Sequence, residues 1–137
     1  MRVSVTSPVF PRLQRRFSQK MVNRYGRVNE DRNLIHYDAE AARSAGFSRP
    51  VVHGALVAAL LSEACRDFFG STWMDTGRFQ VAFIKPVLVE QRVTTRAATL
   101  GSAPFEAGQR IALSVWCENE AGERVAVGEA SAVWSER

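Results

Sequence analysis

The 137-residue sequence lacks several features that would assign a protein to a broad class. No apolar run approaches the roughly 18 residues that a transmembrane helix needs. Two cysteines are present, Cys65 in a helix-like pattern and Cys117 in a strand-like pattern. This usage does not fit a disulfide framework or a zinc site, and it favours a reducing compartment, which we take to be the cytoplasm.

Histidine is scarce as well, since His36 and His53 are the only two. Any histidine chemistry must therefore involve the short stretch that contains them both. Two histidines seventeen residues apart, in segments expected to form separate loops, do not have the usual spacing of metal ligands. We therefore predict no metal site.

Acidic residues are missing from the first 29 positions, and residues 1–32 carry a net charge of +6 against −2 for the rest of the chain. A solvated basic surface is the simplest interpretation, and a phosphate-bearing ligand is the functional alternative. Nucleic acid is disfavoured because no recognition motif and no interleaved aromatic residues accompany the charge. An organellar presequence would also be poor in acids, but Pro8 and Pro11 would interrupt its amphipathic helix.

The order of the expected elements is that of an α+β fold, in one domain that covers residues 1–137. Residues 1–17 are expected to be irregular, with at most a short strand at Val3–Val5. Two capped helices should follow, one from Ser18 to Val28 and one from Asp38 to Gly46.

A longer helix is expected from His53 to Phe69, closed by Gly70. Its first half, Ala55–Leu61, contains no polar residue, so we expect it to be buried on every side. In so small a protein, only a sheet wrapped around the helix could bury it. The C-terminal half of the sequence provides that sheet, with strands expected at Phe79–Ile84, Arg92–Leu100, Ile111–Cys117 and Val125–Trp134. A loop with Gly101, Pro104 and Gly108 should separate the second and third strands, and a bulge is expected at Gly128.

Three short segments resemble the motifs of one enzyme family. They are DRNLIHYD at residues 31–38, ARSAGFSRPVVHGAL at residues 42–56 and FIKPV at residues 83–87. In this order and spacing they resemble the MaoC-like dehydratases, the (R)-specific enoyl-CoA hydratases. The resemblance implies a hotdog fold, in which a curved antiparallel sheet wraps around a long central helix.

The resemblance also implies a reaction and a set of partners. The reaction is reversible hydration of a trans-2-enoyl thioester of CoA or acyl-carrier protein to the (R)-3-hydroxyacyl thioester, as in fatty acid metabolism. No cofactor is expected beyond the CoA or phosphopantetheine that belongs to the substrate. A homodimer or a higher homo-oligomer is expected, because members of the family generally pair their sheets.

Roles for individual residues follow from the resemblance and from side-chain chemistry. Asp31 and His36 are expected to form the catalytic acid/base dyad, since both groups can exchange protons near neutral pH. The Gly54 amide, in the first turn of the central helix, should stabilise negative charge on the thioester oxygen. Asn33 is assigned to shaping the loop and to contact with the substrate, and His53 to packing or capping. Phe83 is assigned to the core.

Two other functions remain open on sequence grounds. A hotdog thioesterase would use an acid on the central helix, where Glu63 is the first one. A non-catalytic acyl-thioester-binding subunit is the other alternative. It is motivated by three departures from the family pattern, at Glu30, Leu34 and Ala59.

Overall fold

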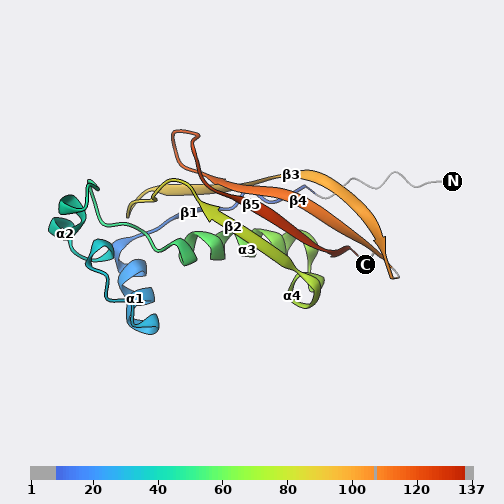
Figure 1. The fold of residues 1–137 in the computed structure, drawn as a ribbon, viewed down its shortest axis with the longest axis horizontal. Coiled ribbons are helices and arrows are strands. Elements are labelled where there is room, and N and C mark those ends of the chain that lie inside the picture. Colours follow the sequence, from blue (N-terminus) through green and yellow to red (C-terminus); the bar gives the residue numbers. More distant parts are fainter. Residues whose placement is uncertain (1–8, 107, 135–137) are drawn as a thin grey trace.

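The computed structural model describes residues 9–106 and 108–134. Its centre is a five-stranded antiparallel sheet that curves over one long helix, α3, as Figure 1 shows. The strands lie in the order β1-β3-β4-β5-β2. Their bounds are Gln14–Arg16 for β1, Arg78–Phe83 for β2, Arg92–Phe105 for β3, Gly108–Glu118 for β4 and Arg124–Trp134 for β5. This arrangement confirms the predicted α+β hotdog fold.

The central helix α3 spans Gly54–Phe69 and ends at Gly70, within one residue of the expected bounds. Its buried face packs against the concave side of the sheet, and the core contains Leu60, Leu61 and Phe69 together with Leu113 and Val115 of β4. Burying such aliphatic and aromatic side chains stabilises the fold by about 1.5–3 kcal/mol each.

The expected burial of α3 on every side is wrong for the single chain. Ala55 and Ala59 are exposed, because the sheet covers only one side of the helix. An apolar helix face left open in this way is a surface that a second polypeptide could cover.

Two shorter helices lie beyond the N-terminal end of α3, outside the cover of the sheet (Figure 1). Helix α1 spans Gln19–Asn29, and Ser18 caps it by accepting a hydrogen bond from the Met21 amide. Helix α2 spans Ala39–Ser44, and Asp38 caps it by accepting one from the Glu40 amide. Both caps are confirmed as predicted. Among the described residues, no helix is long and apolar enough to cross a membrane.

Three elements differ from the sequence-based expectation. Strand β1 lies within the segment expected to be irregular, and with three residues it is too short to show a periodic pattern. The expected strand Val3–Val5 lies outside the described residues. Strand β3 continues through Gly101 and Pro104 as far as Phe105, with a bulge between Thr99 and Gly101 that absorbs the irregularity. Helix α4, Thr72–Thr76, was not anticipated.

The two cysteines are both free and fully buried in the core. Burial raises the pKa of the Cys65 thiol and of the Cys117 thiol to about 12. Since the thiolate is the reactive form, both side chains act as small apolar core residues. The absence of a bridge between them agrees with the sequence-based expectation.

Gly128 lies in the regular part of β5, opposite Val81 of β2, and not at the predicted bulge. A Cβ atom at this position would lie 1.9 Å from the carbonyl oxygen of Gln80. The glycine is therefore required by the close approach of the edge strand β2.

We expect Gly128→Ala to destabilise the protein by roughly 1–3 kcal/mol, because the β2 backbone must move to accommodate the methyl group. Urea unfolding measures the change. Gly101→Ala is the matched control, since its Cβ would meet nothing within 4 Å and should cost little. Equal effects of the two substitutions would contradict this account of Gly128.

Candidate active site

The site begins where α1 ends. Glu30 takes a left-handed backbone conformation, with φ of 55°, and its amide donates to the Gly26 carbonyl. The Asp31 amide donates to the same carbonyl at 3.0 Å. This turn reverses the chain at the end of the helix and directs it back toward the start of α3. The position of Asp31 is therefore set by the end of α1.

A compact loop then connects Asp31 to His36. The Asp31 carboxylate accepts a hydrogen bond from the Asn33 amide at 3.0 Å, and the Asn33 side-chain oxygen accepts one from the Ile35 amide at 3.3 Å. These contacts start the single 3₁₀ turn Leu34–His36. In the structure Asn33 is exposed, and its side-chain oxygen caps this local turn.

His36 is held in one orientation by a backbone carbonyl. Its Nδ1 lies 2.7 Å from the Val51 oxygen. Since a carbonyl can only accept, Nδ1 carries the proton and Nε2 of the neutral ring is left as an acceptor. That Nε2 lies 4.0 Å from Oδ2 of Asp31. The two residues predicted to act as a pair are thus neighbours, with the histidine in a defined tautomer.

His53 joins them from the start of α3. It is buried, with 4% of its side chain exposed, and its ring stacks on His36 with centroids 3.9 Å apart. It forms no helix cap through its side chain. Its Nε2 lies 3.6 Å from Oδ2 of Asp31. The structure therefore adds a second imidazole to the predicted pair, where the sequence indicated only packing or capping.

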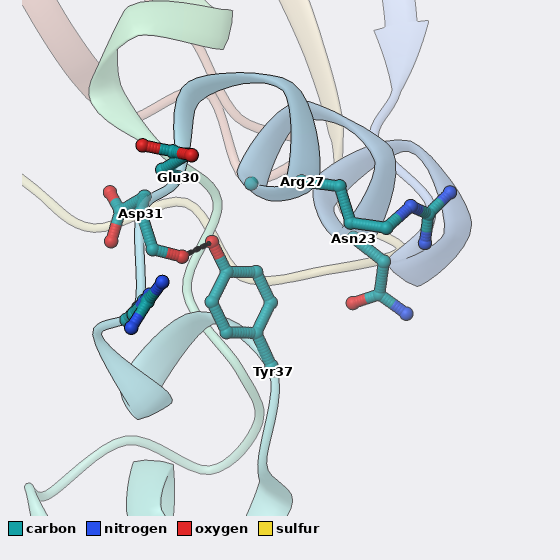
Figure 2. Close-up of a pocket in the computed structure, with 7 residues that line it drawn as sticks. Asn23, Arg27, Glu30, Asp31 and Tyr37 are labelled. Atoms are coloured by element: carbon teal, nitrogen blue, oxygen red, sulfur yellow. Dashed lines mark hydrogen bonds between the residues drawn. The ribbon is translucent and has the colours of Figure 1, made fainter.

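Tyr37 connects these groups through its hydroxyl. The hydroxyl donates to the Asp31 backbone carbonyl at 2.6 Å, as Figure 2 shows, and lies 3.0 Å from Nε2 of His53. The hydroxyl proton is already donated to the Asp31 carbonyl. The Tyr37 oxygen must therefore accept the second hydrogen bond, which means that Nε2 of His53 carries a proton. Gly26 makes room for this contact, since a Cβ there would lie 2.0 Å from the hydroxyl. Tyr37 was not among the predicted site residues, because an aromatic residue beside a histidine in the sequence carries no signal of its own.

The environment keeps His53 and Tyr37 uncharged. Burial lowers the pKa of His53 below its usual value, the charge that His36 can carry lowers it further, and Asp31 partly opposes this. Burial also raises the pKa of Tyr37, and so does the Asp31 carboxylate. A neutral histidine and a neutral phenol fit the hydrogen-bond directions described above.

Among the described residues, the ligand atoms of Asp31, His36 and His53 lie within 4.8 Å of one another, so this cluster could hold a metal ion. Their spacing along the sequence is unusual for metal ligands, but the fold brings both loops together at the start of α3. Even so, the rings stack at an interplanar angle of 23°, so their lone pairs lie in two nearly parallel planes and not in planes that cross at the site. With His53 Nε2 bonded to Tyr37, the arrangement fits an acid/imidazole cluster better than a metal centre.

A cavity of about 330 Å³ opens beside His36 and the first turn of α3. Its walls are mainly apolar and include Val57, Phe83 and Val87. The Gly54 amide is in the first turn of the helix, where amides have no intrahelical partner. The Phe83 ring lies against Gly54, 2.9 Å from the position of a Cβ atom there. Phe83 is half exposed and lines this cavity, so its assignment to the core was wrong.

A second hollow, of about 670 Å³, is lined by residues from the end of α1 and from the loop that follows it. The residues that line it are mostly charged or polar and include Arg27, Arg32, Asp31 and Tyr37, and we call it the polar hollow. In the view of Figure 2, the Tyr37 ring stands between Asp31 and the α1 side chains of Asn23 and Arg27. The acid thus lines the polar hollow, and the imidazole of His36 lines the apolar cavity.

Glu63, the acid considered for a thioesterase, lies outside this site. It is exposed on α3 and accepts a hydrogen bond from Arg15 of β1 at 2.9 Å. It does not line the cavity beside Gly54. The geometry therefore gives no support to Glu63 as a catalytic acid.

Comparisons with known proteins agree on one family. The family model described as the MaoC like domain matches residues 3–118. A mitochondrial 3-hydroxyacyl-[acyl-carrier-protein] dehydratase of Arabidopsis thaliana is 27% identical over 119 residues, which covers 85% of this chain and 70% of that protein. An (R)-specific enoyl-CoA hydratase of Aeromonas caviae is 41% identical over 51 residues, or 37% of this chain and 38% of that protein.

Solved structures agree with the fold. The (R)-hydratase of A. caviae involved in PHA biosynthesis superimposes with a TM-score of 0.76 at 26% identity, and the match covers 96% of this chain and 98% of that one. An R-hydratase of Pseudomonas aeruginosa gives a TM-score of 0.78 at 24% identity, over 93% of this chain and 80% of that one. At this lower identity the second comparison supports the fold alone.

Glu30 gives a first test of how the site is built. A residue with a Cβ pays roughly 1–2 kcal/mol in the left-handed region, and glycine does not. We expect Glu30→Gly to raise the free energy of unfolding by roughly 0.5–1 kcal/mol, after allowing for the greater freedom of glycine in the unfolded chain. Urea unfolding is the measurement, and Glu30→Ala is the control that removes the charge but keeps the strain. A gain of the same size in Glu30→Ala would assign the effect to charge.

The burial of His53 predicts a pH dependence of stability. Its pKa in the folded protein is lower than in the unfolded chain, so the unfolded chain binds the extra proton first. As the pH is lowered below the usual histidine pKa of about 6.5, we therefore expect the free energy of unfolding to decrease. The decrease should stop once the pH is below the pKa of His53 in the folded protein.

Urea unfolding between pH 8 and pH 5 would measure this effect, and an NMR titration of the His53 ring would assign it. In His53→Gln the part of the slope due to this residue should disappear. A His53 ring that titrates at or above the usual histidine value would contradict the argument.

Proposed function

The chain belongs to the MaoC-like domain family, and we propose that it catalyses the reversible hydration of a trans-2-enoyl thioester to an (R)-3-hydroxyacyl thioester. The observation that carries the proposal is the pair formed by Asp31 and His36, 4.0 Å apart beside the apolar cavity and the start of α3. The named activities of the relatives in A. thaliana and A. caviae support the same reaction class.

The pair can hold one water molecule. A water about 2.8 Å from both Oδ2 of Asp31 and Nε2 of His36 fits between acceptors 4.0 Å apart. The carboxylate and the neutral Nε2 each accept one of its hydrogens, which leaves the oxygen lone pairs directed at the substrate. As the oxygen bonds to the β-carbon, one water proton passes to the pair, and the pair returns a proton to the α-carbon.

The Asp31 carboxylate has an additional role in this scheme. If the proton is held on Nε2 of His36, the resulting imidazolium faces a negative charge 4.0 Å away. The two opposite charges attract each other across this distance, so the carboxylate stabilises that step of the scheme. Val51 keeps the ring oriented throughout, because its carbonyl accepts from Nδ1 in either protonation state.

Negative charge develops on the thioester oxygen during the reaction. We propose that the Gly54 amide donates to this oxygen, with help from the partial positive charge at the N-terminus of α3. Loss of a comparable donor in other enzymes lowers the rate by about 10²–10³-fold. The apolar cavity beside Gly54 is then the place for the acyl chain.

The substrate supplies the only prosthetic group that the scheme needs. We propose that its CoA or carrier-protein phosphopantetheine arm leaves the site through the polar hollow at the end of α1, and that the chain uses no separate cofactor. Asn33 is assigned to holding the loop that carries Asp31, because its amide and side-chain oxygen both bond within that loop.

We further propose that the protein works as a homodimer or a larger homo-oligomer. Strand β2 is an edge of the sheet, and its Phe79 and Phe83 side chains and the adjacent Ile84 are exposed in the single chain. An unpaired edge with exposed aromatic residues is a favourable surface for a second copy. Structural neighbours with this fold include heteromeric complexes, such as one of 3R-hydroxyacyl-ACP dehydratase subunits from Mycobacterium tuberculosis.

The test is the hydration of crotonyl-CoA. The reaction is monitored through the loss of absorbance of the conjugated double bond. We expect Asp31→Asn and His36→Gln each to lower kcat by about 10²–10⁴-fold, because each replaces a group that can take up a proton by an amide that cannot. The product of the unaltered enzyme should have the (R) configuration.

Glu63→Gln is the matched control, since it also replaces an acid by its amide, and it should leave hydration unchanged. Release of free CoA from an acyl-CoA, lost in Glu63→Gln and kept in Asp31→Asn, would instead establish a thioesterase. Tight binding of the ester without turnover of any enoyl thioester would establish a non-catalytic binding subunit.

A further inference from the structure

Helix α1 presents a face to solvent that the proposed chemistry does not use. We call it the α1 outer face, and it consists of Lys20, Met21, Arg24, Arg27 and Val28. At 1.5 Å per residue, the cations from Lys20 to Arg27 extend over about 10 Å of helix. The opposite side of α1 is buried at Val22 and Gly26.

The cations of this face are not used within the chain. Among the described residues, Lys20, Arg24 and Arg27 have no carboxylate within 4.0 Å, and α1 itself contains no acid. Elsewhere on the surface some cations are paired, as in Arg15 with Glu63 and Lys85 with Glu123. Lys20 and Arg24 are also four residues apart on one helix face, a spacing at which like charges repel and weaken the helix.

Two large apolar side chains lie among these cations. Met21 is 37% exposed and Val28 is 77% exposed. Phosphates alone would be bound by the cations and would not contact these side chains. A mixed face of cations around apolar residues instead matches a protein surface with acidic and apolar side chains.

The α1 outer face adjoins the site. Arg27 belongs to this face and also lines the polar hollow that reaches Asp31. A partner docked on α1 would therefore stand at the opening through which a substrate arm can reach the acid/imidazole pair.

We propose that the α1 outer face docks an acidic carrier protein, whose phosphopantetheine arm passes through the polar hollow to bring the acyl thioester to Asp31 and His36. The inference rests on the proposed function for the delivery of substrate. It selects a carrier protein over free CoA as the partner that this surface fits.

The experiment compares two crotonyl esters, one of CoA and one of an acidic acyl-carrier protein. Arg24→Glu reverses one charge of the face, and it should not weaken the helix, because it gives Lys20 an acidic neighbour at the favourable spacing. Arg66→Glu is the matched control, an equal charge reversal at an exposed position near the other end of α3.

We expect Arg24→Glu to lower kcat/KM for the carrier ester by about tenfold, and Lys20→Glu with Arg24→Glu to lower it further. For the CoA ester, both variants should stay within about twofold of the unaltered protein. Arg66→Glu should leave both esters within that range. The carrier reaction should also weaken steeply with added salt.

Equal losses on both esters would overturn the proposal and assign the face to the phosphates of CoA. No loss on either ester would also overturn it. Binding of the holo-carrier protein, followed by fluorescence anisotropy, keeps the two proposals separate. A carrier that binds in an Arg24-dependent way without turnover of either ester would remove the hydratase function and leave the docking surface standing.

Discussion

One hydroxyl group joins the two parts of the site. The Tyr37 hydroxyl donates to the Asp31 carbonyl in the loop after α1, and it accepts from His53, the residue directly before the Gly54 amide. These two hydrogen bonds therefore help to fix the position of the acid relative to the N-terminus of α3. The contact is possible only because Gly26 leaves space on α1 for the ring.

Exposure increases in steps across the cluster. The side chain of His53 is 4% exposed, that of His36 is 12% exposed and that of Asp31 is 36% exposed. Burial penalises charge, so the innermost ring stays neutral and supports its neighbours through stacking and the Tyr37 hydroxyl. The outermost group, Asp31, keeps access to water. The order of burial thus fits a supporting role for His53 and agrees with the reacting roles that we propose for Asp31 and His36.

The sequence predicted those features that depend on local chemistry. Ser18 and Asp38 cap their helices, and α3 follows an apolar run closed by Gly70, because these signals act within a few residues. The neighbourhood of Asp31 and His36 came from a family motif. The stacking of His53 on His36 and the bonds of Tyr37 could not be predicted, since they depend on how α1, the loop and α3 pack together. The exposed face of α3 could not be predicted for the same reason. The sequence pattern shows that a helix is apolar, but it does not show how far a sheet extends around that helix.

The departures from the family pattern lie around the reacting pair and not within it. Glu30 occupies a turn position that favours glycine, Leu34 is exposed on the 3₁₀ turn, and Ala59 lies on the open face of α3. Neither Leu34 nor Ala59 lines the apolar cavity or the polar hollow. Substitutions at such places can change the stability of the loop and the surfaces that a partner meets, but they leave the acceptors Oδ2 of Asp31 and Nε2 of His36 in place. Differences between this chain and its relatives are therefore expected in which thioester reaches the site, and less in how the water is activated there.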